Sequence, residues 1–285
     1  MKLRNLIIFF LSLILFCQVR KADASALGYG YFRHLTFIKT PDNDTNNLLW
    51  KSEKANGFFL EFTASDSSNL PVYKDLITAG VKSTESFFST SFAKDFKIYI
   101  HPTRSSLDSS WQIDWSMPNF KSECWMVASG IATKLDMISP KLWDSLSCEH
   151  KYSDKVRTQQ LITHELIHVF HGQKNASPDF SNVEGIDWFV EGLATYASGQ
   201  CDSSRIAEIK KAISENNIPD ALDNFWTGKL KYGLSGSVVK FLDHKFGRKK
   251  ITELLPFSKK QDILSFLDIT ETQLLEEWKS YISDL

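Results

Sequence analysis

The chain has 285 residues, of which 42% are hydrophobic and 24% are charged, and its formal net charge is −1. These values are typical of a folded globular protein and exclude a disordered or fibrous chain. No block of Lys and Arg with interleaved aromatic residues occurs in the sequence. We therefore expect no nucleic-acid partner and no attraction to anionic membrane surfaces.

The first residues have the pattern of a secretory signal peptide. Two basic residues precede an apolar run, and small residues follow that run. The run has about a dozen residues, which is short for spanning a bilayer. We predict a signal peptide over residues 1–26 that is cleaved after Ala24 or Ala26. The mature protein would then be secreted or periplasmic, without stable membrane insertion.

The first half of the mature chain alternates strand and helix signals. The predicted strands are residues 58–63, 97–101, 125–129 and 133–138. The predicted helices are residues 71–92, opened by Pro71, and residues 105–111. The last two strands would form a hairpin that turns at Gly130. Residues 27–57 have no clear period and receive no assignment.

The second half has a helical period throughout. Ser153 or Asp154 can cap a helix that runs to His171 and is stopped by Gly172. The further predicted helices are residues 186–198, 203–215, 232–246, 248–255 and 271–283. The sequence therefore predicts an α+β fold. A lobe with a small mixed sheet and a helix (residues 27–152) would precede a mainly helical lobe (residues 153–285) in one compact unit.

Three cysteines remain after removal of the signal peptide, namely Cys124, Cys148 and Cys201. An odd number permits one internal disulfide and leaves one free thiol. A bridge is in keeping with an exported protein. Cys148 precedes the helix that begins near residue 154, and Cys201 follows the next helix. If those helices are antiparallel, Cys148 and Cys201 approach each other.

The segment LITHELIHVFHG at residues 161–172 contains the pattern H-E-x-x-H. Residues four apart lie on the same face of a helix, so His164 and His168 can reach one metal ion, with Glu165 beside it. Apolar neighbours indicate that this helix is buried, and buried polar groups need partners. The alternative interpretation is a helix whose three polar side chains only form hydrogen bonds inside a core.

A catalytic zinc site usually has three protein ligands, so a third is required. Glu191 lies in the apolar segment WFVEGLATYASG at residues 188–199, where burying a carboxylate is otherwise costly. Gly192 would let this helix approach the first one closely. An exposed Glu191 is the alternative, with His171 and Asp187 as competing ligands.

These two segments together resemble the gluzincins, the thermolysin-type zinc metallopeptidases with an HExxH and a downstream glutamate, and within them the peptidase MA-like group. The second segment matches the family pattern W-x-x-E-G-x-A-x-Y at Trp188, Glu191, Gly192, Ala194 and Tyr196. The resemblance covers roughly residues 125–283. It implies a zincin-like fold with the active site between two lobes. The sequence lacks the G-x-M-E-N motif with which zinc aminopeptidases recognise the substrate amine.

The resemblance implies hydrolysis of a peptide or protein substrate. Zn²⁺ held by His164, His168 and Glu191 would lower the pKa of its bound water to about 7. Glu165 would act as the general base and pass the proton to the leaving amine. The predicted function is an exported zinc metallopeptidase. The alternative is a secreted zincin-fold binding module without turnover.

The tetrahedral intermediate needs a further hydrogen-bond donor for its oxyanion. The family often places a tyrosine or histidine on a later helix for this purpose, which makes Tyr232 the candidate. Tyr196 and His101 are its rivals. Thr195 lies one turn after the glutamate ligand, so its hydroxyl could accept a hydrogen bond from the second ring nitrogen of a ligand histidine.

Overall fold

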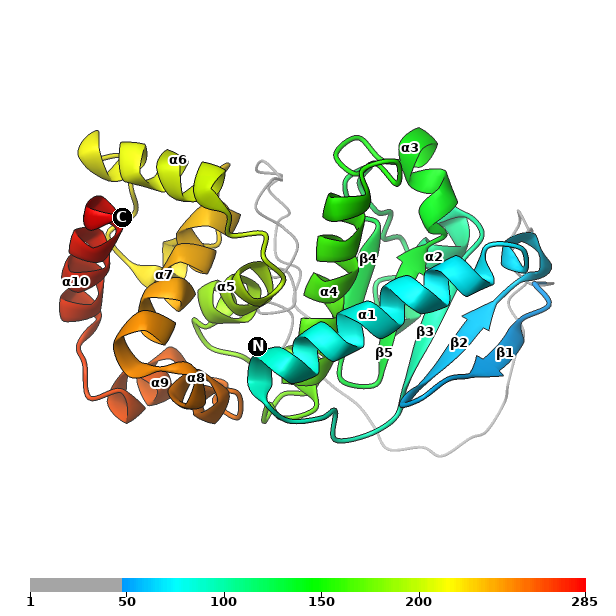
Figure 1. The fold of residues 1–285 in the computed structure, drawn as a ribbon, viewed down its shortest axis with the longest axis horizontal. Helices are drawn as coiled ribbons and strands as arrows, with labels where there is room; N and C mark the ends of the chain where they lie inside the picture. Colours follow the sequence, from blue (N-terminus) through cyan, green and yellow to red (C-terminus); the bar gives the residue numbers. More distant parts are fainter. Residues whose placement is uncertain (1–47) are drawn as a thin grey trace, which may run out of the picture.

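The computed structural model describes residues 48–285. The predicted signal peptide and most of the unassigned segment 27–57 lie outside the described residues. The fold is α+β, as predicted, with a five-stranded mixed sheet and helices before and after it. Figure 1 places the sheet with α1 to α4 on one side of the molecule and α5 to α10 on the other.

The sheet has the strand order β1-β2-β3-β5-β4. Its strands are β1 (Lys51–Lys54), β2 (Phe58–Phe62), β3 (Phe96–His101), β4 (Ala128–Ile131) and β5 (Lys134–Ile138). The three central strands β2, β3 and β5 are parallel, whereas β1 and β4 pair antiparallel at the two edges. Alternate residues of β3, Phe96, Ile98 and Ile100, are buried, as the period of two requires.

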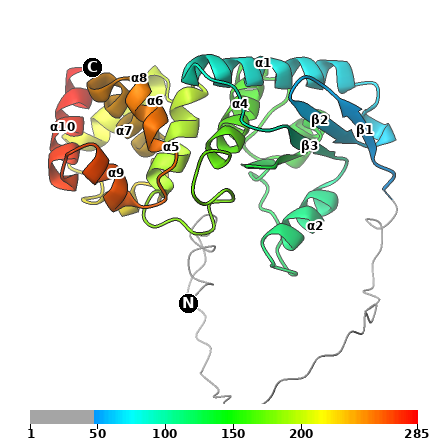
Figure 2. The same ribbon diagram turned by 90° about the horizontal axis from the view of Figure 1, so that it is seen from below.

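Helices cover both faces of the sheet. The long helix α1 (Leu70–Phe88) and α4 (Lys155–Gly172) lie on one face, and α2 (Arg104–Asp114) lies on the other (Figure 2). A short helix, α3 (Trp143–Leu146), follows β5. The apolar side chains between α1, α4 and the sheet form one hydrophobic core.

The second half of the chain forms a second hydrophobic core. Its helices are α5 (Asp187–Ala197), α6 (Ser203–Ser214), α7 (Lys231–Phe246), α8 (Arg248–Leu254), α9 (Lys260–Phe266) and α10 (Glu271–Asp284). Of these, α9 has no counterpart in the predicted elements. Leu166 and Val169 of α4 belong to the sheet core, whereas Ile167 and Phe170 belong to the helical core. Helix α4 therefore contributes side chains to both hydrophobic cores.

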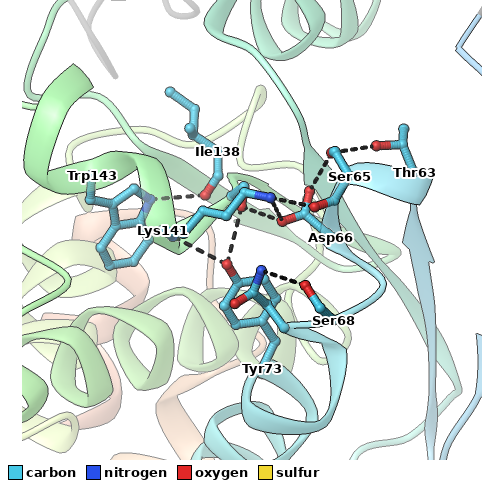
Figure 3. A network of polar contacts seen from close by, with 10 residues as sticks. Thr63, Ser65, Asp66, Ser68, Tyr73, Ile138, Lys141 and Trp143 are labelled. Carbon is cyan, nitrogen blue, oxygen red and sulfur yellow. Dashed lines mark hydrogen bonds and ion pairs between the residues drawn. The ribbon is translucent and has the colours of Figure 1, made fainter.

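A buried polar network joins the start of α1 to the end of β5 (Figure 3). Asp66 is fully buried, accepts a hydrogen bond of 2.6 Å from the Ser139 hydroxyl, and lies 3.1 Å from the Lys141 ammonium. The Tyr73 hydroxyl lies 3.2 Å from Ser139 and accepts a hydrogen bond from the backbone N–H of Lys141. Because every charge in this network has a partner, its burial is tolerated.

The predicted hairpin exists, but its turn lies at residues 132–133 and not at Gly130. Gly130 is inside β4 and packs against the backbone of α4. A Cβ atom at Gly130 would lie 2.2 Å from the carbonyl oxygen of Glu165. This glycine therefore permits close contact between a strand and a helix. In the sequence, a glycine needed for such a contact looks the same as a glycine needed for a turn.

The predicted disulfide pairing was wrong. Cys124 pairs with Cys148, and Cys201 is a buried free thiol. The bridge joins the loop before β4 to the loop before α4. Cys201 instead packs on α7, where a Cβ atom at Gly236 would lie 3.2 Å from its sulfur. One bridge and one free thiol, as the odd number of cysteines permits, are present. Among residues 48–285, no helix is long and apolar enough to span a bilayer.

Candidate metal centre

Helix α4 places His164 and His168 on one side, facing α5. The helix begins where predicted, because the Asp154 carboxylate accepts a hydrogen bond from the backbone N–H of Arg157. It ends after Gly172, whose missing side chain leaves room for the backbone of the next loop, with the Pro178 carbonyl oxygen 2.6 Å from the Cβ position. The predicted stop at Gly172 is correct to within one residue, and the physical reason is close packing.

Helix α5 brings Glu191 to the same point. The Nε2 atoms of His164 and His168 are 3.0 Å apart. The Oε2 atom of Glu191 is 3.4 Å from the first of these nitrogen atoms and 3.6 Å from the second. All three residues are buried, and together they form a group that could hold a metal ion.

The spacing of these three atoms fits a tetrahedral metal ion. Bonds of about 2.0–2.1 Å in tetrahedral geometry put neighbouring ligand atoms about 3.3 Å apart. The observed separations of 3.0, 3.4 and 3.6 Å bracket this value. Two imidazole nitrogens that face each other at 3.0 Å also need a proton or a cation between them, because both otherwise present lone pairs. The donor set therefore suits a cation such as Zn²⁺.

The ligand side chains stabilise one another's charged forms even without a metal ion. Burial alone would raise the pKa of Glu191, but the charge of His168 and hydrogen bonds from both histidines hold it well below its usual range. Burial opposes the charged form of His168, yet the Glu191 carboxylate raises the pKa of that imidazole. A proton on His168 thus supplies part of the positive charge that a metal ion would provide.

Glu165 lies next to the ligands but is not one of them. Its side chain is partly exposed, and the backbone N–H of Gly130 in β4 lies near enough to its carboxylate to favour the charged form. Burial and the Glu191 carboxylate raise the pKa of Glu165, while the two histidines and the Gly130 N–H oppose the rise. A carboxylate in this position is oriented by the edge strand and can reach water.

Tyr232 borders the same site from α7. Its ring lies 6.4 Å from the His164 ring in an edge-to-face arrangement. Burial raises the pKa of Tyr232 well above its usual value, and the nearby carboxylates of Glu191 and Glu165 raise it further. The phenol therefore stays protonated at neutral pH and can donate a hydrogen bond.

The two rivals of Tyr232 form hydrogen bonds elsewhere. The His101 ring nitrogens are each 2.9 Å from a partner, Ser106 on one side and Asp136 on the other. The Tyr196 hydroxyl donates a hydrogen bond of 2.7 Å to Asp243. Neither side chain is free to contact a group bound at the metal centre.

The competing third ligands are outside the group. His171 is fully buried beside the Phe180 ring, and its Nε2 atom accepts a hydrogen bond from the Asn175 amide. Asp187 lies one turn before Glu191, and burial together with that carboxylate raises its pKa to about 6. The predicted outer-shell bond of Thr195 is absent, because its hydroxyl has no partner among the described residues.

Burial lowers the pKa of His171 to about 3, and this shift predicts a pH dependence of stability. The unfolded chain takes up this proton near pH 6.5 and the folded chain does not, so stability falls as the pH drops below 6.5. The loss should reach about 4 kcal/mol near pH 3. Urea unfolding of wild type and of His171→Gln between pH 7 and pH 4 measures it. Equal slopes in the two proteins would contradict this assignment.

Comparisons with protein-family models and with curated proteins find no match. The chemistry of the site therefore has to be inferred from its own residues. Two residues near the site were not predicted from the sequence. His150 lies near His164 and near the backbone of Trp125, and Lys231 directly precedes Tyr232. For His150, the signal in the sequence was the nearby Cys148, because its bridge to Cys124 brings the loop of His150 beside the loop of Trp125.

Gly192 allows a close approach, but to α7 and not to α4 as predicted. A Cβ atom at this position would lie 2.3 Å from the carbonyl oxygen of Ser235. The helix that carries Glu191 is therefore fixed by backbone contact with α7.

We expect Gly192→Ala to lower the free energy of unfolding by about 3 kcal/mol, because a backbone atom cannot move aside as a side chain can. Urea unfolding measures the change. The matched control is Gly233→Ala on α7, where the new Cβ would meet the Ile209 side chain at 3.0 Å and, among backbone atoms, the Arg205 carbonyl oxygen at 3.7 Å. An effect no larger than that of the control would contradict the packing argument.

Proposed function

We propose that the protein is an exported zinc metallopeptidase of the gluzincin type, with a zincin-like arrangement of its two lobes around the active site. The observation that carries this proposal is the convergence of three buried ligand atoms, with the Glu165 carboxylate beside them. A site that only stabilised the fold would have no use for this fourth group. The Cys124–Cys148 bridge is in keeping with an oxidising compartment.

In this proposal His164, His168 and Glu191 hold the zinc ion. When bound, zinc supplies a Lewis acid and lowers the pKa of water enough to give a nucleophile near neutral pH. Glu165 accepts the proton of the attacking water and delivers it to the leaving amine. The Gly130 N–H keeps that carboxylate in place, and the Tyr232 hydroxyl donates a hydrogen bond to the developing oxyanion.

The edge strand β4 supports a peptide as the substrate. Among residues 48–285 it pairs only with β5 in the sheet, and its Gly130 N–H points away from β5 toward Glu165. The edge of β4 opposite β5 therefore lies beside Glu165. An extended peptide can add to such an edge as a further strand, and this would bring a peptide bond to the site in a defined orientation.

Metal analysis combined with digestion of a peptide library tests the proposal. The purified mature chain should contain about one zinc ion per molecule, which is the content of a single catalytic centre. Mass spectrometry should detect cleavage that a chelator stops and that added zinc restores. Absence of zinc would contradict the proposed metal. Stoichiometric zinc without cleavage would favour the alternative, a secreted binding module that lacks turnover.

A further inference from the structure

Beside the metal centre, three aromatic rings surround one lysine. The Lys231 ammonium nitrogen lies 4.7 Å from the Trp226 ring centre, 5.1 Å from that of Trp125 and 5.3 Å from that of Tyr232. Trp125 comes from the loop before β4, whereas the other two rings belong to the helical half. The lysine is half-buried between the two halves of the molecule. We call these four residues, together with Arg205, the cationic subsite.

Lys231 lacks a counter-charge. Within residues 48–285 its ammonium forms no ion pair or hydrogen bond, and burial lowers its pKa. The comparably buried lysines Lys134 and Lys260, with side chains 18% and 19% exposed, each contact two carboxylates. The three rings attract the ammonium through cation–π contacts but do not neutralise its charge. A carboxylate of a ligand would supply the missing counter-charge.

Glu191 and Glu149 lie close enough to favour the charged form of Lys231, but neither is in contact with it. A divalent cation on Glu191 would remove even this support, because the metal would then balance that carboxylate. Arg205 adds a second positive charge, since its guanidinium carbon lies 5.1 Å from the Tyr232 ring centre and no carboxylate of the described chain pairs with it. The cationic subsite is therefore most positive when the metal is bound.

We infer that Lys231, assisted by Arg205, binds a carboxylate of the substrate. This inference rests on the proposed peptidase function and specifies its substrate class. The Tyr232 ring lies 6.4 Å from His164 and 5.3 Å from the ammonium, so the ammonium is no more than about 12 Å from the His164 ring. An extended chain advances about 3.4 Å per residue. The carboxylate is thus within about three residues of the scissile bond.

Such a carboxylate has two sources, the C-terminus of a short peptide and an acidic side chain. The aromatic rings cover part of the ammonium, and this partial removal from water strengthens its hydrogen bond to either carboxylate. Four N-acetylated hexapeptides of alanine and phenylalanine separate the sources. One has a free C-terminus, one is amidated, and two are amidated with Glu or Gln at one interior position.

We expect kcat/KM to be about tenfold to hundredfold higher for the free acid than for the amide, or for the Glu peptide than for the Gln peptide. The pair that differs identifies the source. Lys231→Met should bring that ratio close to one, whereas Lys231→Arg should retain it. Lys249→Met, on α8 with a side chain 92% exposed, is the matched control and should leave the ratio unchanged.

Calorimetric binding of the same peptides to zinc-loaded Glu165→Gln, with and without Lys231→Met, separates this inference from the proposed function. Carboxylate-dependent binding that Lys231→Met abolishes, without cleavage by wild type, supports the cationic subsite and contradicts the peptidase. Cleavage and binding that are equal within both peptide pairs overturn the inference and leave the peptidase intact. Circular dichroism of each variant verifies that it is folded, and Lys231→Gln, which also removes the charge, supplies the result if Lys231→Met does not fold.

Discussion

Glu165→Gln should lower kcat/KM for peptide hydrolysis by about 10²- to 10⁴-fold, which is the usual contribution of a general base. The substitution keeps the shape of the side chain, and the amide oxygen can still lie near the Gly130 N–H. What it removes is the ability to accept a proton from water. Because Glu165 is outside the group of ligand atoms, zinc content should remain that of wild type.

The control for this prediction is Glu184→Gln, which removes a carboxylate whose side chain is 76% exposed and paired with Lys259 on the surface. Hydrolysis by this variant should equal that of wild type. Peptide cleavage followed by mass spectrometry and zinc measured by atomic absorption report on the two properties separately. Undiminished cleavage by Glu165→Gln would refute the assigned role.

Glu191→Gln should weaken zinc binding by more than about 100-fold, beyond the 10- to 100-fold losses typical of outer-shell changes. The substitution removes one of three ligands and its negative charge. It also leaves two histidine nitrogens 3.0 Å apart without the carboxylate that raises the pKa of His168. Competition with a chromophoric chelator measures the affinity, and cleavage should be lost together with the metal.

Asp187→Asn is the matched variant, because Asp187 lies one turn earlier on the same helix and also carries a perturbed carboxyl group. Zinc affinity should change little in this variant, since the carboxylate is not among the convergent atoms. If Asp187→Asn lost the metal and Glu191→Gln retained it, the third ligand would be Asp187 and the geometry of α5 would have to be reinterpreted.

The elements that carry the candidate site were predictable because each contains its own local signal. The start of α4 follows from the capping residue Asp154, and its metal-binding face follows from two histidines four residues apart. Glu191 was identified because a carboxylate in an apolar helix needs a reason to be there. The α+β class followed from strand periods in the first half and helical periods in the second.

What the sequence could not reveal depends on contacts between distant segments. Gly130 and Gly192 each mark a close approach, but a glycine does not indicate which backbone approaches it. The partner of Cys148 depends on which loops become neighbours, and three cysteines permit three pairings. Lys231 is an ordinary helix residue by sequence, and only the packing of loops around it distinguishes it from the other lysines.

The bridge between Cys124 and Cys148 closes a covalent ring that contains the whole β4–β5 hairpin, including the glycine that orients Glu165. A single backbone cut anywhere between the two cysteines would leave both pieces joined. The secreted peptidase proposed above would be exposed to other proteases and to its own copies, and surface loops are where such nicks occur. We expect a chain nicked inside this ring to migrate as two fragments only after reduction, and to keep its hairpin in place until then.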